Sequence, residues 1–298
     1  MVQSTVSWLN FSTAVMKCDL TIMSGAGNVF VVAPTEELPP TLIAPYSHQL
    51  CQAALQFCNH PADGVLLVDQ GESELIVHYL NPDGTSGMMC GNGARCAVAF
   101  AQSKGWIHST CELTLAGERY QAIIRDDGKS IAVTFPPPRS IIERDYLILD
   151  GAPLYYAYVD VGSDHVVLDH RAFRTWLQSH NQELDFLNLA SQVRSHPTFP
   201  RGANVNLYRV TDRALHLITY ERGVERITGA CGTGALASAV IAWIHNQYSG
   251  TTIPIIPPSG EELSVTIFTK QHSITGLILS GPASVLGTVT VELPIEQQ

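Results

Sequence analysis

Positive charge is scarce in this chain of 298 residues. Lysine and arginine together number 17 against 27 aspartate and glutamate residues, so the formal net charge is −10. An acidic chain without a cluster of basic residues is a poor match for nucleic acid or for an anionic membrane surface. We therefore expect neither partner, and the 45% of apolar residues predicts a globular protein with sizeable cores.

Motifs typical of metal and cofactor sites are also missing. The 7 cysteines include no Cys-x-x-Cys pair, so the usual zinc spacing is absent, and their odd number does not suit a disulfide framework. The turn at Gly25-Ala26-Gly27 has Phe30 where a dinucleotide fingerprint needs glycine, and no Gly-Lys-Ser/Thr follows it. We expect no metal, no cofactor, and reduced thiols in a cytoplasmic protein.

Long hydrophobic runs are absent as well. The longest apolar stretch, residues 235–244, is far shorter than the ~20 residues that span a bilayer. Residues 1–15 have neither a basic residue nor a continuous apolar segment, so they do not resemble a signal peptide. We interpret them as a short N-terminal extension. The remaining length predicts two domains, since one domain usually takes ~100–200 residues.

One motif is written twice in this chain. Cys90-Gly-Asn-Gly-Ala and Cys231-Gly-Thr-Gly-Ala share the pattern Cys-Gly-x-Gly-Ala, and the second cysteine follows the first at close to half the chain length. The same offset aligns flanking residues without a gap: Ala62 with Ala203, Leu66 with Leu207, Ile76 with Leu217, Val77 with Ile218, and Tyr79 with Tyr220. Each copy reads as strand, loop, cysteine and helix, which predicts two similar halves.

Apolar periodicity and turn residues predict alternating strands and helices, an α/β (α+β) fold class. We expect helices at residues 47–58, 93–103, 171–180 and 233–246. We expect strands at residues 19–24, 29–32, 65–68, 74–80, 155–161, 204–210 and 214–220, with more within 112–135 and 262–293. The run Pro136-Pro137-Pro138 predicts a boundary between a first half (16–137) and a second half (138–298), whose last strands return toward the first half.

A cysteine at a helix start lies at the positive end of the helix dipole, beside backbone N–H groups that lack an internal partner. This environment favours the thiolate, the reactive form of a group whose ordinary pKa is ~8.5. The glycines after each cysteine let a ligand approach the backbone, and the bare N–H groups can hold a carboxylate. One motif alone would fit a buried structural cysteine equally well. Two matched copies favour a functional site.

Two thiols on opposite faces of one small ligand suit the inversion of a carbon that bears hydrogen. A thiolate removes the proton and the opposite thiol returns another, with no metal or cofactor. A cysteine–histidine hydrolase is the alternative chemistry. However, no histidine stands beside Cys90 or Cys231 in the sequence, and a hydrolase would leave the second cysteine without a role.

At these residues the sequence resembles the diaminopimelate epimerase family of cofactor-independent amino-acid epimerases. The resemblance covers about residues 23–242. Four motifs carry it: Cys90-Gly-Asn-Gly-Ala-Arg-Cys96, Glu221-Arg222-Gly223 leading to Ala230-Cys231-Gly-Thr-Gly234, Phe199-Pro200-x-Gly202-x-Asn204-Val205-Asn206, and Asn81-x-Asp83-Gly84.

The resemblance implies two pseudo-symmetric halves, each a mixed β-sheet curled around a central helix, with the active site between them. It implies that Cys90 and Cys231 act as acid and base in converting LL-diaminopimelate to meso-diaminopimelate, a step of lysine and peptidoglycan precursor synthesis. It further implies a small amino-acid substrate and a homodimer. The implied substrate contacts are the backbone at Gly91, Asn92, Gly232 and Thr233 for the reacting carboxylate, and the side chains of Asn28, Asn81, Asn204, Glu221 and Arg222.

Three positions depart from the family pattern. Val29 follows Asn28 where the family has aspartate. Ser163-Asp164 precedes His165 where the family has Asn-Pro, so the shorter Ser163 replaces a substrate-contacting asparagine. The segment 226–228, which includes Ile227, lacks the glutamate of the family's Gly-Glu-Thr. These changes leave open an amino-acid racemase of the same fold with a different or broader substrate range.

Other readings of individual residues stay open. A non-catalytic binding protein could keep the fold, although the retention of both cysteines argues against it. His165 either assists the reaction or fixes its loop. Cys96 is expected to pack inside its helix. Buried or incidental thiols are expected at the remaining cysteines, Cys18, Cys51, Cys58 and Cys111.

Overall fold

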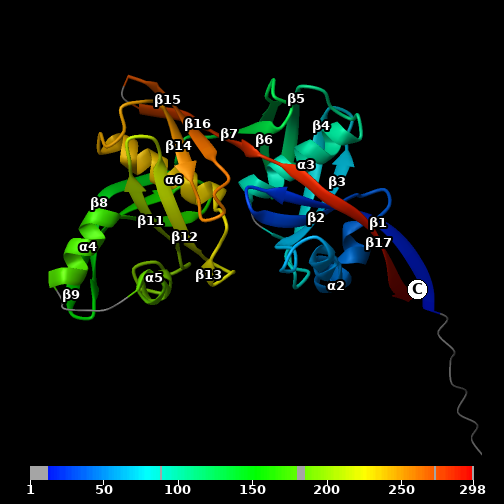
Figure 1. Cartoon of the computed structure of the whole chain (residues 1–298), viewed down its shortest axis with the longest axis horizontal. Coiled ribbons are helices and arrows are strands. Elements are labelled where there is room, and N and C mark those ends of the chain that lie inside the picture. Colours follow the sequence, from blue (N-terminus) through cyan, green and yellow to red (C-terminus); the bar gives the residue numbers. More distant parts are fainter. Residues whose placement is uncertain (1–12, 88, 180–184, 272, 297–298) are drawn as a thin grey trace, which may run out of the picture.

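The computed structural model describes residues 13–87, 89–179, 185–271 and 273–296. Residues 1–12 of the predicted N-terminal extension lie outside these ranges, whereas residues 13–15 already belong to the first strand, β1 (Thr13–Gly25). The chain forms two lobes side by side (Figure 1). The last strand, β17 (Ser284–Glu296), returns from the second lobe to pair with β1 of the first.

The first half contains strands β1 to β7 and the helices that connect them. After β1, the strands are β2 (Asn28–Pro34), β3 (Gly64–Gln70), β4 (Glu74–Leu80), β5 (Thr110–Leu115), β6 (Glu118–Ile124) and β7 (Ser130–Phe135). The helices are α1 (Pro40–Ile43), α2 (Ser47–Gln52) and α3 (Gly91–Ser103), with the 3-10 helices η1 (Ala44–Tyr46) and η2 (Ala53–Gln56).

The second half contains strands β8 to β16. These are β8 (Ser140–Leu149), β9 (Ala152–Asp160), β10 (Asp164–Asp169), β11 (Asn204–Val210), β12 (Leu215–Glu221), β13 (Arg226–Ile227), β14 (Thr252–Ile256), β15 (Leu263–Lys270) and β16 (Ser273–Pro282). Its helices are α4 (His170–Ser179), α5 (Phe186–Arg194) and α6 (Gly232–Ile244).

Backbone pairing joins the strands of both halves in one path. The order is β17-β1-β2-β3-β4-β5-β6-β7-β16-β15-β14-β12-β11-β10-β9-β8, and β13 adds to β12. The halves meet where β7 pairs antiparallel with β16. The two sheets are therefore held together by a continuous hydrogen-bond ladder as well as by side chains.

The two halves share one connection pattern. Parallel neighbours occur at β2–β3 and β4–β5 in the first half, and at β10–β11 and β12–β14 in the second. Helix α3 connects β4 to β5, and α6 connects β12 to β14. The repeat in the sequence is thus a repeat of topology, and the predicted fold of two pseudo-symmetric halves is confirmed.

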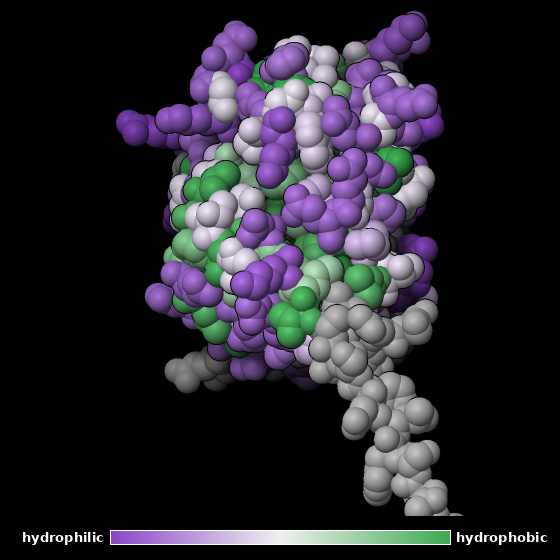
Figure 2. All heavy atoms as spheres, turned by 90° about the vertical axis from the view of Figure 1, so that its right-hand side faces the viewer, coloured by the Kyte–Doolittle hydropathy of each residue, from purple (hydrophilic) through white to green (hydrophobic). Residues whose placement is uncertain are grey.

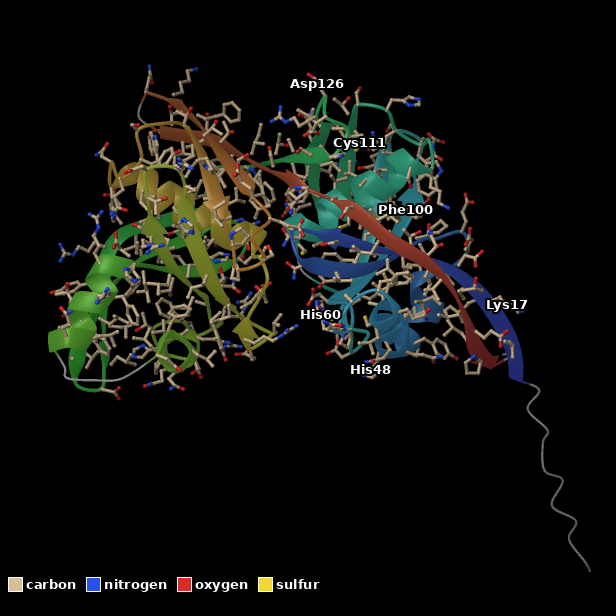
Figure 3. The ribbon with its side chains drawn as sticks, in the orientation of Figure 1. Lys17, His48, His60, Phe100, Cys111 and Asp126 are labelled. Atoms are coloured by element: carbon tan, nitrogen blue, oxygen red, sulfur yellow. The ribbon has the colours of Figure 1, made fainter. Side chains whose placement is uncertain are left out.

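The central helices α3 and α6 are enclosed by their sheets. Every residue of α6 from Gly232 to Ala242 is buried, and its sequence contains no charged residue. Helix α3 carries a single charged side chain, Arg95. A helix buried on all sides has to be apolar all round. The labelled Phe100 of α3, which is 1% exposed, accordingly lies inside the first lobe (Figure 3).

Outer helices cover the other faces of the sheets. In the first half, α2 packs Leu50 and Cys51 against a core that includes β1 and β3. In the second half, α4 and α5 place Phe173 and Leu189 over a core that includes β10 and β11. Hydrophobic and hydrophilic side chains are interspersed on the outer face of the first lobe (Figure 2).

Several predicted boundaries were wrong. The helix expected over 47–58 is divided into α2 and η2. The helix expected over 171–180 is α4, and its expected last residue lies outside the described residues. Sequence periodicity did not predict seven elements. Two of them are strands without a regular alternation: edge strand β8 is exposed over most of its length, and β10 is buried on both faces. The others are α1, η1, α5, β13 and β14.

None of the helices within the described ranges is long and apolar enough to cross a membrane.

Candidate active site

Cys90 and Cys231 occupy the same position at the start of the two central helices. Cys90 is the N-cap of α3 with φ −127° and ψ 107°, and its Sγ accepts a hydrogen bond from the backbone N–H of Gly93 at 3.4 Å. Cys231 is the N-cap of α6 with φ −121° and ψ 110°, and its Sγ accepts from Gly234 at 3.4 Å. Each thiol thus takes the capping place that a Ser or Asp side chain usually fills.

The two helix N-termini meet at Gly91 and Gly232. A Cβ atom on Gly232 would lie 3.6 Å from the Cα of Gly91 and 2.8 Å from Cδ2 of Leu279. A side chain at either position would therefore collide with its surroundings. The Nδ2 of Asn92 donates to the carbonyl of Ala230, the residue before Cys231, at 3.1 Å. The structure thus brings together the four predicted backbone positions, 91, 92, 232 and 233.

Burial, rather than the helix dipole, dominates the protonation of the thiols. Burial raises the pKa of Cys90 to about 11, although the N–H of Gly93 and the charge of Arg95 act in the opposite direction. Burial also raises the pKa of Cys231, and Glu221 adds to this effect. The helix ends thus favour the thiolates as expected, because the N–H groups of Gly93 and Gly234 lower the pKa of their cysteines, but burial is the larger effect and the pKa of both thiols is raised.

Glu221 ends strand β12 close enough to influence both thiols. Its charge raises the pKa of Cys90 and of Cys231. Burial raises the pKa of Glu221 itself to about 7, and the neighbouring charge of Asp63 adds to this shift. One Glu221 oxygen accepts a hydrogen bond from Thr228 Oγ1 at 2.8 Å. A carboxyl that titrates near neutrality beside two thiols is typical of a functional site.

Asn28 belongs to a chain of side chains that reaches the second half. Its Oδ1 accepts from Asn92 at 2.6 Å, and its Nδ2 donates to Asp63 Oδ2 at 3.1 Å. Asp63 also pairs with Arg226, which comes from β13 of the second half, at 3.4 Å. Sequence reasoning missed Asp63 and Arg226. The repeat did offer a signal for Asp63, because the offset between the two cysteines aligns it with Asn204.

Asn204 and Arg222 lie together at the end of the second sheet. The Oδ1 of Asn204 accepts from the backbone N–H of Arg222 at 2.9 Å, and its Nδ2 donates to the carbonyl of Asp164 at 3.1 Å. The Arg222 guanidinium donates to Asp164 Oδ2 at 3.4 Å, and to the carbonyls of Arg201 and Gly202 at 3.0 and 3.1 Å. Arg222 is therefore anchored on the protein by a carboxylate that sequence reasoning had not assigned.

His165 is fully buried, and its hydrogen bonds hold the loop at Ser163 in place rather than transfer protons. Its Nδ1 accepts from Asn206 Nδ2 at 3.0 Å, which leaves the ring proton on Nε2 to be donated to Ser163 Oγ at 2.8 Å. The Oδ1 of Asn206 in turn accepts from Thr219 at 2.9 Å. Because burial lowers the pKa of His165 to about 3, the ring stays neutral. This geometry favours the positioning of Ser163 over direct assistance.

Asn81 and Thr233 complete the set of predicted residues. Asn81 follows β4, as Arg222 follows β12, but its Nδ2 donates to Thr85 Oγ1 at 2.9 Å and to the carbonyl of Ser86 at 3.5 Å. Within the described ranges, no hydrogen bond joins Asn81 to the other predicted site residues. Thr233 Oγ1 lies 3.6 Å from Cys231 Sγ, which places its hydroxyl directly beside the second thiol.

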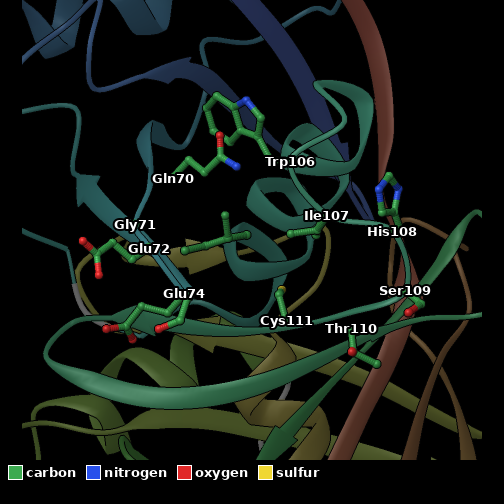
Figure 4. A pocket seen from close by; sticks show the side chains of 12 residues that line it. Gln70, Gly71, Glu72, Glu74, Trp106, Ile107, His108, Ser109, Thr110 and Cys111 are labelled. Atoms are coloured by element: carbon green, nitrogen blue, oxygen red, sulfur yellow. The ribbon is translucent and has the colours of Figure 1, made fainter.

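A separate pocket of about 370 Å³ lies in the first half, next to the segment that follows α3, and Figure 4 shows the side chains that line it. The turn between β3 and β4 and the segment from Trp106 to Cys111 line it, and none of the predicted site residues does. Burial raises the pKa of Cys111 there to about 11, so this thiol is also protonated. Across the described residues, no three His, Cys, Asp or Glu side chains are grouped as metal ligands.

Comparison with known proteins relates the chain to one family. A family model described as Diaminopimelate epimerase matches residues 20–140 and 158–286. A diaminopimelate epimerase of Aquifex aeolicus (strain VF5) is 32% identical over 225 residues, which are 73% of this chain and 77% of the relative. A diaminopimelate epimerase of Chlorobaculum tepidum is 31% identical over 277 residues, which are 90% of this chain and 100% of the relative.

The solved structures share the fold at low sequence identity. The crystal structure of a hydroxyproline epimerase from Agrobacterium vitis with bound trans-4-OH-L-proline matches with a TM-score of 0.65 and 16% identity, over 94% of this chain and 92% of that chain. The family match and these relatives show an isomerase of the epimerase class. The chain belongs to the diaminopimelate epimerase family.

Replacing Glu221 with glutamine is expected to change stability in a pH-dependent way. A carboxyl whose folded-state pKa is raised to about 7 favours folding while it is protonated, and this contribution is lost as the pH rises from about 4.5 toward 7. Across that window the unfolding free energy of the wild type should fall by about 3 kcal/mol relative to Glu221→Gln. Urea unfolding at several pH values measures this difference.

The exposed Glu262 supplies the control, because Glu262→Gln removes one negative charge without opening a buried site. A difference between wild type and Glu221→Gln that stays constant with pH would show that the pKa of Glu221 is the same in the folded and unfolded states, and would contradict the raised value.

Proposed function

We propose that the protein inverts the α-carbon of diaminopimelate, from the LL to the meso form, with Cys90 and Cys231 as the two acid/base groups and without a cofactor. The observation that carries the proposal is the matched placement of the two thiols as N-caps of helices that meet at Gly91 and Gly232. Membership of the diaminopimelate epimerase family supports the choice of substrate. The reaction would serve lysine and peptidoglycan precursor synthesis.

The N-termini of the two central helices form the binding site for the substrate α-carboxylate. A substrate α-carboxylate placed between the two N-termini would meet backbone N–H groups of both helices, at 91–92 and at 232–233. There it would face the positive ends of two helix dipoles, which stabilise the negative charge that develops when the α-proton leaves. The helix ends thus hold the carboxylate in place, and one thiol lies on each side of the α-carbon attached to it.

The thiols exchange roles in one turnover. A thiolate takes the α-proton and becomes a thiol, and the electron pair moves into the enolate of the carboxylate. The opposite thiol then donates its proton to the other face of the carbon and becomes the thiolate. The burial that makes Cys90 and Cys231 difficult to ionise makes either thiolate a stronger base than an ordinary one, which suits a weakly acidic Cα–H.

Replacing either thiol is expected to abolish net epimerisation. Cys90→Ala and Cys231→Ala should each lower kcat by at least about 100-fold, because each removes one of two proton-transfer groups. Interconversion of LL- and meso-diaminopimelate, followed by chiral chromatography, measures the loss. Cys111→Ala, in the remote pocket, is the matched control and should keep the wild-type rate. Wild-type turnover in either single variant would contradict the two-thiol mechanism.

A racemase of the same fold with a different or broader substrate range is the second candidate. The specific observation in its favour is the ionised Asp164 held against Arg222 and Arg201. Burial opposes this ionisation, but hydrogen bonds from Tyr158 and Arg201 outweigh it and lower the pKa of Asp164. A second carboxylate on the substrate would have to compete with Asp164 for the arginines. This competition favours amino acids without that group.

A panel of amino acids in deuterated water separates the two candidates. Diaminopimelate should take up α-deuterium fastest under the first proposal. In Asp164→Asn, where the internal carboxylate is lost, kcat/KM for diaminopimelate relative to lysine should rise about tenfold, equivalent to ~1.4 kcal/mol. Rapid uptake by another amino acid and none by diaminopimelate would replace the first proposal with the second. The homodimer stays a prediction of the resemblance, and the cytoplasmic location stays a prediction from the cysteines.

A further inference from the structure

Arg95 is a buried cation that the proton transfers do not use. It lies one helical turn after Gly91 on α3 and is 0% exposed. Among the described residues it is the only lysine or arginine that is buried, and no carboxylate of those residues lies within ion-pairing distance of it. Burying an unpaired charge is costly, so such a group needs a compensating role.

The second half does without this cation. The offset that superposes Cys90 on Cys231 aligns Arg95 with Leu236 of α6, which is also 0% exposed. An apolar side chain therefore suffices for packing at the equivalent position of the same fold. Strand β16 passes close to the guanidinium at Gly281, where a Cβ would lie 2.3 Å from Leu263 Cδ2 and 3.3 Å from Arg95 Cζ. Packing alone does not explain why the first half carries arginine.

The guanidinium connects the first helix end to the second half. Its Nη1 donates to the carbonyl of Gly91 at 3.3 Å, and its Nη2 donates to Asn92 Oδ1 at 2.8 Å. Its Nε donates to the carbonyl of Pro282, at the end of β16, at 3.3 Å. Three donors in one rigid plane thus hold the first two residues of α3 and the last residue of β16 in the other half. A lysine, with one ammonium, cannot reproduce this fork.

Arg95 also decides which way the Asn92 amide faces. A guanidinium only donates, so Asn92 must turn its oxygen toward Arg95. Its Nδ2 then points the other way, to Asn28 Oδ1 at 2.6 Å and to the carbonyl of Ala230 at 3.1 Å. Ala230 immediately precedes Cys231, so the amide that Arg95 orients fixes the second cysteine relative to the first helix end.

The charge acts unequally on the two thiols. Burial lowers the pKa of Arg95 only to about 10, so the group stays positive at neutral pH. Its charge lowers the pKa of Cys90 against the effect of burial. On the other side, Leu236 supplies no charge to Cys231.

We propose that Arg95 is a positioning residue for both cysteines: it holds the Asn92 amide in the orientation that bridges to Ala230, and it places a positive charge on the Cys90 side of the site. The expected effect of Arg95 on turnover rests on the proposed function. Its expected effect on the reactivity of the Cys90 thiol does not. Arg95 touches no substrate in this scheme and acts through Asn92 and Cys90.

Two substitutions distinguish the effect of the forked hydrogen bonds of the guanidinium from the effect of its positive charge. Arg95→Lys keeps the charge and loses the fork, whereas Arg95→Gln keeps an amide donor and loses the charge. Leu236→Met is the matched control, because it changes a side chain at the same depth of the other helix with little change in volume. The first readout is the pH dependence of Cys90 alkylation by iodoacetamide, followed by peptide mass spectrometry. The second is the pair of kcat and KM values for diaminopimelate.

We expect the midpoint of Cys90 alkylation to rise by about one pH unit in Arg95→Gln and to stay near the wild-type value in Arg95→Lys and Leu236→Met. We expect kcat to fall at least about tenfold in both Arg95 variants, with KM changed by less than about threefold, because the relative placement of the thiols affects proton transfer more than binding. The control should keep both values.

The proposal is overturned if the Cys90 midpoint is the same in Arg95→Gln and wild type, or if Arg95→Lys keeps the wild-type kcat. If Arg95→Gln does not fold, the kcat of Arg95→Lys decides the matter, because that variant keeps the buried charge. If the wild type turns over no diaminopimelate, the proposed function fails, and the alkylation midpoints still test the effect of Arg95 on Cys90.

Discussion

The convergence of two helix N-termini at Gly91 and Gly232 is the contact on which the rest of the structure depends. Both helices must lie deep inside their sheets for their ends to meet, which requires an almost uncharged sequence in α3 and α6. The ladder between β7 and β16 brings the sheets together at the same place. Glycine is required at both contact positions because a Cβ on either would strike Leu279. The two thiols lie near one another because they cap these two ends, and the charge of Cys90 accordingly raises the pKa of Cys231.

Burial and the helix dipole oppose one another at this contact. The helix ends favour negative charge, yet the loss of water around the thiols is the larger effect, so the pKa of both cysteines is raised. In the proposed mechanism the helix ends act mainly on the substrate carboxylate and on the charge that develops next to it. Arg95 and Glu221 adjust this balance from opposite sides, since one lowers and the other raises the pKa of Cys90.

The sequence predicted those parts of the site that the repeat contains. Cys90, Cys231 and their glycines follow from one motif written twice, and the fold of two halves follows from its spacing. Asp63, Arg226 and Asp164 were not predicted as site residues, because their roles depend on which strands become neighbours and on which loops face each other. Net pKa shifts were beyond prediction for the same reason, since they depend on the depth of burial. Exposed β8 and doubly buried β10 lack the alternation that identifies a strand.

The central claim is that two thiols on opposite faces of the substrate carry out the inversion, and the direct test is the position of deuterium early in the reaction. LL-diaminopimelate should be converted in deuterated water, stopped at low conversion, and both stereoisomers analysed by mass spectrometry. The two-thiol mechanism predicts α-deuterium in nearly every product molecule and almost none in the recovered substrate, because the donating thiol carries solvent deuterium and is not the group that took the proton. Equal labelling of product and recovered substrate, or transfer of the original proton to the product, would contradict it.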